Sequence, residues 1–166
     1  MAAPFPAPVK TWHNAVYDEI SPKRLELSAK GKIVVVTGGG IGIGRSVALA
    51  FAEAGAPTIA IVGRTEKALA EAKRDIENQY SSTKIVVLVA DITEEASFTK
   101  TLTAFKQTHG AIDIFVHNAG YMSDLLPVGD ADVNEAFKSF EVGFNPFSAA
   151  LQSIKTLLTL AHADQC

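Results

Sequence analysis

A glycine-rich segment between a β-branched run and a helical pattern constrains this chain more than any other feature. Residues 37–44 read Thr-Gly-Gly-Gly-Ile-Gly-Ile-Gly. Residues 33–36 before them are all isoleucine or valine, and a run without polar alternation is typical of a strand buried on both faces. Residues 42–55 carry apolar side chains at helical spacing and end on Gly55, so they predict a helix. We therefore expect the chain to turn sharply from a buried strand into a helix.

Such a turn has the composition of an anion-binding loop. A helix N-terminus presents unpaired N–H groups and a partial positive charge, which attract a diphosphate, and glycines let the backbone come close to it. Gly44 would also let the helix pack tightly on the sheet. The spacing is T-G-x-x-x-G-x-G and not G-x-G-x-x-G, because Ile43 stands where the last glycine of that pattern would fall. No Gly-Lys-Ser/Thr follows, which excludes a Walker-type phosphate loop, and nucleotide binding is the favoured interpretation.

Strand and helix patterns alternate along the chain. The further expected strands are residues 58–62, 85–90 and 112–116, and the further expected helices are residues 66–80, 93–109 and 131–161, the last interrupted at Gly143 and Pro146. Thr93 is the candidate N-cap of the helix that it begins. This alternation predicts an α/β fold, a doubly wound parallel sheet of about four strands with helices on both faces. Residues 1–30, with four prolines, predict an irregular N-terminal arm before one domain over residues 31–166.

Composition excludes several classes of protein. The 166 residues have a net charge of −3, so long-range attraction to nucleic acid or an anionic membrane is not expected. The single cysteine, Cys166, allows no disulfide within the chain, and no stretch approaches the ~20 apolar residues of a membrane span. The histidines lack the spacing of metal ligands. We expect a cytoplasmic protein without a metal site and without nucleic-acid or membrane partners.

Three motifs in order resemble those of the short-chain dehydrogenase/reductase family. They are the turn of residues 37–44, Ala-Asp-Ile-Thr at 90–93 after the third expected strand, and His-Asn-Ala-Gly at 117–120 after the fourth. The third motif is similar to the family's N-N-A-G, with His117 in first place. The resemblance covers about residues 31–150 and implies a Rossmann-like NAD(P)-binding domain. The resemblance implies cofactor contacts at Gly38, Gly40, Ile41, Gly42, Ile43, Gly44, Asp91, Ile92, Asn118, Ala119 and Gly120. Arg64, which follows the second expected strand, is a further candidate contact.

The end of the second expected strand bears on which nicotinamide cofactor binds. An acidic residue there would bind a ribose 2′-hydroxyl, whereas an arginine would accept a 2′-phosphate. This chain has Gly63-Arg64-Thr65 and no acid before Glu66, which favours NADP(H) over NAD. The alternative is that Arg64 is a solvated surface residue, and Ile41 stands where some NADP-using relatives carry a second basic residue.

Two other candidate residues also allow a structural interpretation. Asp91 can be a turn residue, although its place after a parallel strand favours ligand contact. We interpret His117 as a packing residue and not as a catalytic base.

The catalytic residues of the family are missing from the places where they would be expected. The resemblance implies a serine and a Tyr-x-x-x-Lys pair after a fifth strand, in which the lysine lowers the pKa of the tyrosine. Tyr80 and Lys84 have this spacing, but they precede the third strand and are rejected; Tyr121 is followed by Leu125 at that distance. Gly143 stands where relatives carry an asparagine. The chain ends near the expected fifth strand, so we predict an incomplete, truncated domain with no catalytic residues of its own.

Three functional hypotheses remain open at this stage. The first is the cofactor-binding part of an NADP(H)-dependent oxidoreductase that transfers hydride between nicotinamide and a small-molecule carbonyl or alcohol. The second is a non-catalytic nucleotide-binding pseudoenzyme or partner subunit, and the third is a methyltransferase of related fold. The fourth strand would be left at a sheet edge, so we expect a marginally stable chain or a homo-oligomer.

Overall fold

The molecule is built around one parallel sheet of four strands. The computed structural model describes residues 13, 15–124, 126–127 and 129–143. The strands are β1 (Ile33–Thr37), β2 (Thr58–Gly63), β3 (Lys84–Val89) and β4 (Ile114–Val116), in the spatial order β3-β2-β1-β4. The helices between them are α1 (Gly42–Glu53), α2 (Glu66–Gln79) and α3 (Glu95–His109). All strand pairs are parallel, which confirms the predicted α/β class.

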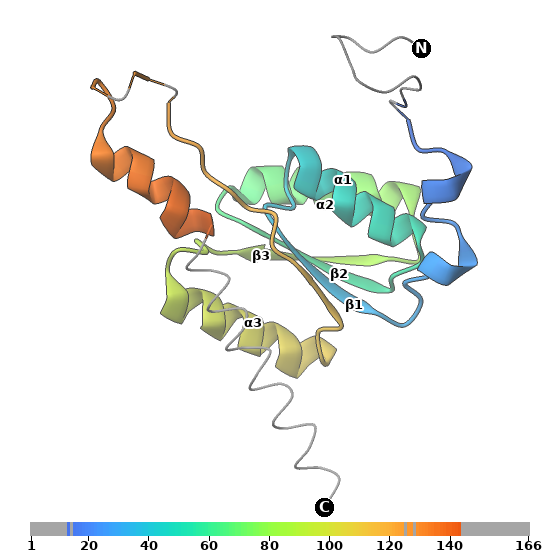
Figure 1. Cartoon of the computed structure of the whole chain (residues 1–166). Coiled ribbons are helices and arrows are strands. Elements are labelled where there is room, and N and C mark those ends of the chain that lie inside the picture. Colours follow the sequence, from blue (N-terminus) through green and yellow to red (C-terminus); the bar gives the residue numbers. More distant parts are fainter. Residues whose placement is uncertain (1–12, 14, 125, 128, 144–166) are drawn as a thin grey trace, which may run out of the picture.

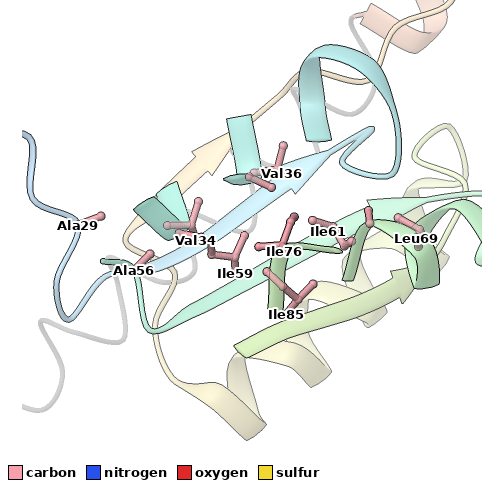
Figure 2. Packing of buried hydrophobic residues seen from close by; sticks show 12 residues of the cluster. Ala29, Val34, Val36, Ala56, Ile59, Ile61, Leu69, Ile76 and Ile85 are labelled. Atoms are coloured by element: carbon pink, nitrogen blue, oxygen red, sulfur yellow. The ribbon is translucent and has the colours of Figure 1, made fainter. Parts of the chain in front are cut away.

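Helices cover both faces of the sheet. Helices α1 and α2 lie together on one face and α3 lies on the other, as Figure 1 shows. The side chains of β1 alternate between the two layers: Val34 and Val36 pack with α1 and α2, and Val35 packs with α3. All three are fully buried, which confirms that this apolar run is a strand covered on both faces. Figure 2 shows the first layer, in which side chains of β1, β2 and β3 meet those of α2.

The predicted starts of β4 and α3 were each two residues too early. β4 begins at Ile114 and not at residue 112, because the side chain of Asp113 accepts a hydrogen bond from the backbone amide of Ile33 at 2.8 Å while its own amide donates to the Ile33 carbonyl at 2.9 Å. Thr93 is not an N-cap. Helix α3 begins at Glu95, and the hydroxyl of Thr93 donates to the carboxylate of Asp91 at 2.8 Å.

The described part of the N-terminal arm is less irregular than predicted. It contains two short 3₁₀ helices, η1 (Asp18–Ile20) and η2 (Leu25–Leu27). Its last part joins the body of the protein, because Ala29 is buried in the first layer and its amide donates to the carbonyl of Ala54 at 2.9 Å. The arm is therefore anchored at the start of the sheet.

The predicted C-terminal helix is described only in part. Residues 133–143 are helical, and the remainder of the predicted range, to residue 161, lies outside the described residues. Among the residues that are described, no helix has the length and apolarity to cross a membrane.

Candidate functional site

A pocket of about 500 Å³ lies at the carboxyl ends of the strands. Loops after all four strands contribute to it, which is where ligands bind in open α/β sheets. Every residue predicted to contact a cofactor lines this pocket. These residues are Gly38, Gly40, Ile41, Gly42, Ile43, Gly44, Arg64, Asp91, Ile92, Asn118, Ala119 and Gly120.

Glycine is required at several positions of the turn between β1 and α1, at some by the backbone conformation and at others by the lack of room for a side chain. Gly38 and Gly42 have φ of 67° and 54°, in the left-handed region that favours glycine. A Cβ on Gly44 would lie 2.3 Å from the carbonyl oxygen of Gly38 and 2.5 Å from Nδ2 of Asn118. No described atom comes within 4 Å of a Cβ placed on Gly42, so open space lies over the start of α1. The N-cap residue Ile41 has no side-chain acceptor, so the first helix amides face the pocket without a side-chain cap.

Thr37 holds the glycine turn against the loop after β4. Its side chain is fully buried, and its Oγ1 accepts hydrogen bonds from the backbone amides of Asn118 and Ala119, both at 3.0 Å. Nδ2 of Asn118 donates to the backbone carbonyl of Thr37, also at 3.0 Å. From the sequence, Thr37 is recognisable only as the first residue of the turn. A hydroxyl at the end of an otherwise apolar buried strand was the signal for this role.

His117 contacts two polar atoms on different elements. Its Nδ1 lies 3.4 Å from Oγ1 of Thr37, and its Nε2 lies 3.2 Å from the carbonyl oxygen of Gly143 in the helix of residues 133–143. These contacts add a polar role to the packing role that the sequence analysis favoured.

Arg64 and Asp91 face each other across the mouth of the pocket. The Arg64 side chain is 74% exposed, and its guanidinium lies 3.8 Å from a carboxylate oxygen of Asp91. The other carboxylate oxygen accepts hydrogen bonds from the amide and hydroxyl of Thr93, at 2.9 and 2.8 Å. Burial raises the pKa of Asp91, but these hydrogen bonds and the charge of Arg64 outweigh it, so the pKa lies below its usual value. Asp91 thus forms turn hydrogen bonds with Thr93 and also lines the pocket, and its contact with a cofactor stays a prediction.

The rim of the pocket beside Gly120 contains a polar cluster. The Tyr121 hydroxyl donates to a carboxylate oxygen of Glu135 at 2.7 Å, and Lys138 forms an ion pair with the other oxygen. The hydrogen bond to Glu135 raises the pKa of Tyr121 above its usual value. This shift is opposite in sign to the one that would make a tyrosine a proton donor and acceptor near neutral pH.

Tyr80 and Lys84 lie away from the pocket. Tyr80 ends α2 and Lys84 begins β3, so the pair lies at the amino ends of the strands and neither residue lines the pocket. This placement supports the rejection of their Tyr-x-x-x-Lys spacing. No cluster of potential metal ligands is found among the described residues, and Cys166 lies outside them.

Eight further lining residues were missed. They are Val62, Gly63, Thr65, Ala68, Leu69, Ala90, Tyr121 and Val142. Four of them, Gly63, Thr65, Ala90 and Tyr121, are direct neighbours of predicted residues, so adjacency was the signal for them. Val62 lies at the end of β2, and Ala68 and Leu69 reach the pocket from α2. Val142 carries no such signal, because it reaches the pocket from a helix far along the chain.

Comparisons with known proteins agree with the geometry. Residues 32–162 match the family model of short chain dehydrogenases. The chain is 34% identical over 152 residues to short chain dehydrogenase tazN of Aspergillus terreus, covering 92% of this chain and 33% of that protein. It is similar to the structure of NAD+-bound xylitol dehydrogenase, with a TM-score of 0.70, 27% identity, and coverage of 75% of this chain and 47% of that one. A metagenomic short-chain oxidoreductase in complex with NADP gives a TM-score of 0.68 at 22% identity, covering 75% and 55% of the two chains.

The chain spans a third to about half of the length of curated relatives that it matches. The matched residues include the glycine turn, the loop after β3 and the loop after β4, which together form the pocket. With four parallel strands in this order and a family match over most of its length, the chain belongs to the short chain dehydrogenase family.

Proposed function

We propose that this chain is the NADP(H)-binding part of a short-chain oxidoreductase that transfers hydride between nicotinamide and a small-molecule carbonyl or alcohol. The observation that carries the proposal is the pocket over the glycine turn, with Arg64 at its mouth. The turn leaves free space over the start of α1, at the position where helix amides attract a diphosphate. We place the arm at residues 1–30 and the nucleotide-binding domain at residues 31–166.

Each part of the pocket would bind a different part of the cofactor. The amides at the start of α1 would bind the diphosphate, and Asp91 with Ile92 would contact the adenine. Asn118 and Ala119, which Thr37 holds in place, would form the wall beside the nicotinamide. The bound cofactor would supply or accept the hydride. The residues described here bind and orient it.

Arg64 supports NADP(H) over NAD. It directly follows β2, and its side chain is exposed. Its guanidinium lies 3.8 Å from the carboxylate of Asp91, which is longer than a direct hydrogen bond. A 2′-phosphate can form a charge-assisted, two-pronged contact with a guanidinium in this position. The structural neighbours include both an NAD+-bound and an NADP-bound protein, so the preference rests on Arg64.

Calorimetric titration of the purified chain with NADPH and NADH tests the proposal. We expect tighter binding of NADPH, and we expect Arg64→Ala to weaken NADPH binding about tenfold while leaving NADH binding nearly unchanged. Arg74→Ala is the matched control, because Arg74 is an exposed arginine of α2 that does not line the pocket. A preference for NADH that survives Arg64→Ala would exclude the NADP assignment.

The alternative function is a non-catalytic nucleotide-binding subunit. The position of Tyr80 and Lys84 outside the pocket supports the expectation that the chain alone does not turn over. Reductase activity of this chain with NADPH and generic carbonyls, abolished by Tyr80→Phe, would contradict that expectation. We further propose a cytoplasmic homo-oligomer that binds neither nucleic acid nor membrane, consistent with its mild net charge of −3.

A further inference from the structure

His117 connects two walls of the pocket without lining it. Nδ1 approaches the hydroxyl of Thr37 at 3.4 Å, and Nε2 approaches the carbonyl of Gly143 at 3.2 Å. Thr37 holds Asn118 and Ala119, which form one wall, and Gly143 directly follows Val142, which contributes to another. The imidazole therefore lies behind both walls.

The hydrogen bonds of Thr37 determine whether Nδ1 of His117 carries a proton. A hydroxyl oxygen has two lone pairs and one proton. The amides of Asn118 and Ala119 occupy both lone pairs, each at 3.0 Å, so the Thr37 hydroxyl can only donate further. Its possible acceptors are Nδ1 of His117 at 3.4 Å and the carbonyl of Val116 at 3.5 Å. A protonated Nδ1 would face an oxygen without a free lone pair, so Nδ1 is expected to be unprotonated.

The carbonyl of Gly143 determines the state of the other ring nitrogen. A carbonyl oxygen only accepts hydrogen bonds, so Nε2 at 3.2 Å must carry a proton to bond with it. We propose that His117 is a neutral imidazole protonated on Nε2, and that in this form it is a positioning residue that couples the Thr37 network to the helix of residues 133–143. This inference rests on the proposed function, since it concerns the walls of the same pocket.

The contact at Gly143 differs from the other hydrogen bonds to this helix in the element from which its partner comes. The amide of Ser123 donates to the Ser139 hydroxyl at 3.2 Å, and Tyr121 donates to Glu135. Both come from the loop after Gly120, whereas His117 directly follows β4. His117 thus connects the helix to the end of the sheet itself and orients Val142 toward the pocket. Its loss should shift that wall without removing a direct contact to the nucleotide.

Nitrogen-15 NMR of the full chain tests the tautomer directly. We expect Nδ1 of His117 to resonate as an unprotonated ring nitrogen and Nε2 as a protonated one at neutral pH. The chain has four histidines, so the His117 signals are identified by their loss in His117→Gln. His109→Gln, on α3 and outside this pocket, is the control that should leave them unchanged. A proton on Nδ1, or rapid averaging between the two tautomers, would overturn the proposal.

Substitutions separate the two contacts of the ring. Glutamine places an amide near the position of Nε2 and asparagine places one near Nδ1, so His117→Gln retains a donor for Gly143 and His117→Asn retains an acceptor for Thr37. We expect NADPH to slow amide exchange in residues 133–143 of the wild type. His117→Ala should abolish this protection and raise the Kd for NADPH about three- to tenfold, the range for one neutral hydrogen bond.

The comparison of the two amide variants decides the role of the ring. His117→Gln should restore the protection of residues 133–143 more fully than His117→Asn. Equal behaviour of these two variants, or unchanged protection in His117→Ala, would overturn the coupling. Failure of the wild type to bind NADPH would overturn the proposed function, whereas a wrong tautomer would overturn the role of His117 whether or not NADPH binds.

Discussion

At the scale of single residues, the site depends on positions where adding a methyl group or removing a hydroxyl group would disturb the structure. Gly44 is the clearest case, because a Cβ at this position would lie 2.3 Å from the carbonyl oxygen of Gly38 and 2.5 Å from the side-chain amide nitrogen of Asn118. The absence of a Cβ therefore lets the first turn of α1 approach the loop after β4. A side chain at this position would separate the two loops that form the pocket.

We predict that Gly44→Ala destabilises the protein by ~1–3 kcal/mol, as expected for overpacking. The added methyl would meet backbone at 2.3 Å, which a rotamer change cannot relieve. Urea unfolding measures the loss. Gly129→Ala is the control, because no described atom lies within 4 Å of its Cβ position. Equal stability of the two variants would contradict the tight contact.

Thr37 supports a second prediction at this scale. Thr37→Val keeps a similar shape but leaves the amides of Asn118 and Ala119 without their acceptor in a buried setting. We expect a loss of about 2 kcal/mol in the free energy of unfolding, with a parallel loss of nucleotide binding. Thr37→Ser retains the hydroxyl and should recover most of both. Equal loss in both variants would show that the methyl group, and not the hydroxyl, matters.

At the scale of elements, the sequence predicted every strand and helix of the sheet but not all of their ends. β1 and β2 were predicted to within a residue, because glycines and apolar runs mark their limits locally. The start of β4 was missed because Asp113 bonds to Ile33, which is 80 residues away in the sequence. No pattern near Asp113 reveals that partner.

The bond between Asp113 and the start of β1 makes stability depend on pH. The hydrogen bond from the Ile33 amide, aided by Lys32, lowers the pKa of Asp113 from its usual 3.8 despite partial burial. The stabilisation is fully present above the unfolded value and is lost as the pH falls through the folded value. We expect Asp113→Asn, which keeps an acceptor but no charge, to flatten the fall in stability below about pH 4. Urea unfolding across pH measures this, and an unchanged slope would contradict it.

At the scale of the whole molecule, apolar surface remains exposed at the β4 side. Among the described strands β4 is at the sheet edge, and its residues are half-buried. Val133, Phe137 and Phe140 form a stripe along the helix of residues 133–143, with 78%, 61% and 67% of their surfaces exposed. Exposed edges and apolar patches of this kind favour association.

We predict that the isolated chain either self-associates or has a low melting temperature. Light scattering and calorimetry at several concentrations measure both properties. The double substitution Phe137→Glu and Phe140→Glu should reduce association, whereas Met122→Glu, also at an exposed apolar residue but outside this helix, should have a smaller effect. A monomer that melts cooperatively at every concentration would contradict the prediction.

The sequence by itself determined the order of the elements, the burial of β1 on both faces and twelve of the twenty residues that line the pocket. Each of these follows from local patterns: β-branched runs, helical spacing, and motifs at the ends of strands. Only the tertiary structure decided that Thr37 holds the loop after β4, that Arg64 faces Asp91, and that His117 reaches Gly143. These contacts join residues between 26 and 81 positions apart, and their distances depend on the packing of the sheet, which no local pattern specifies.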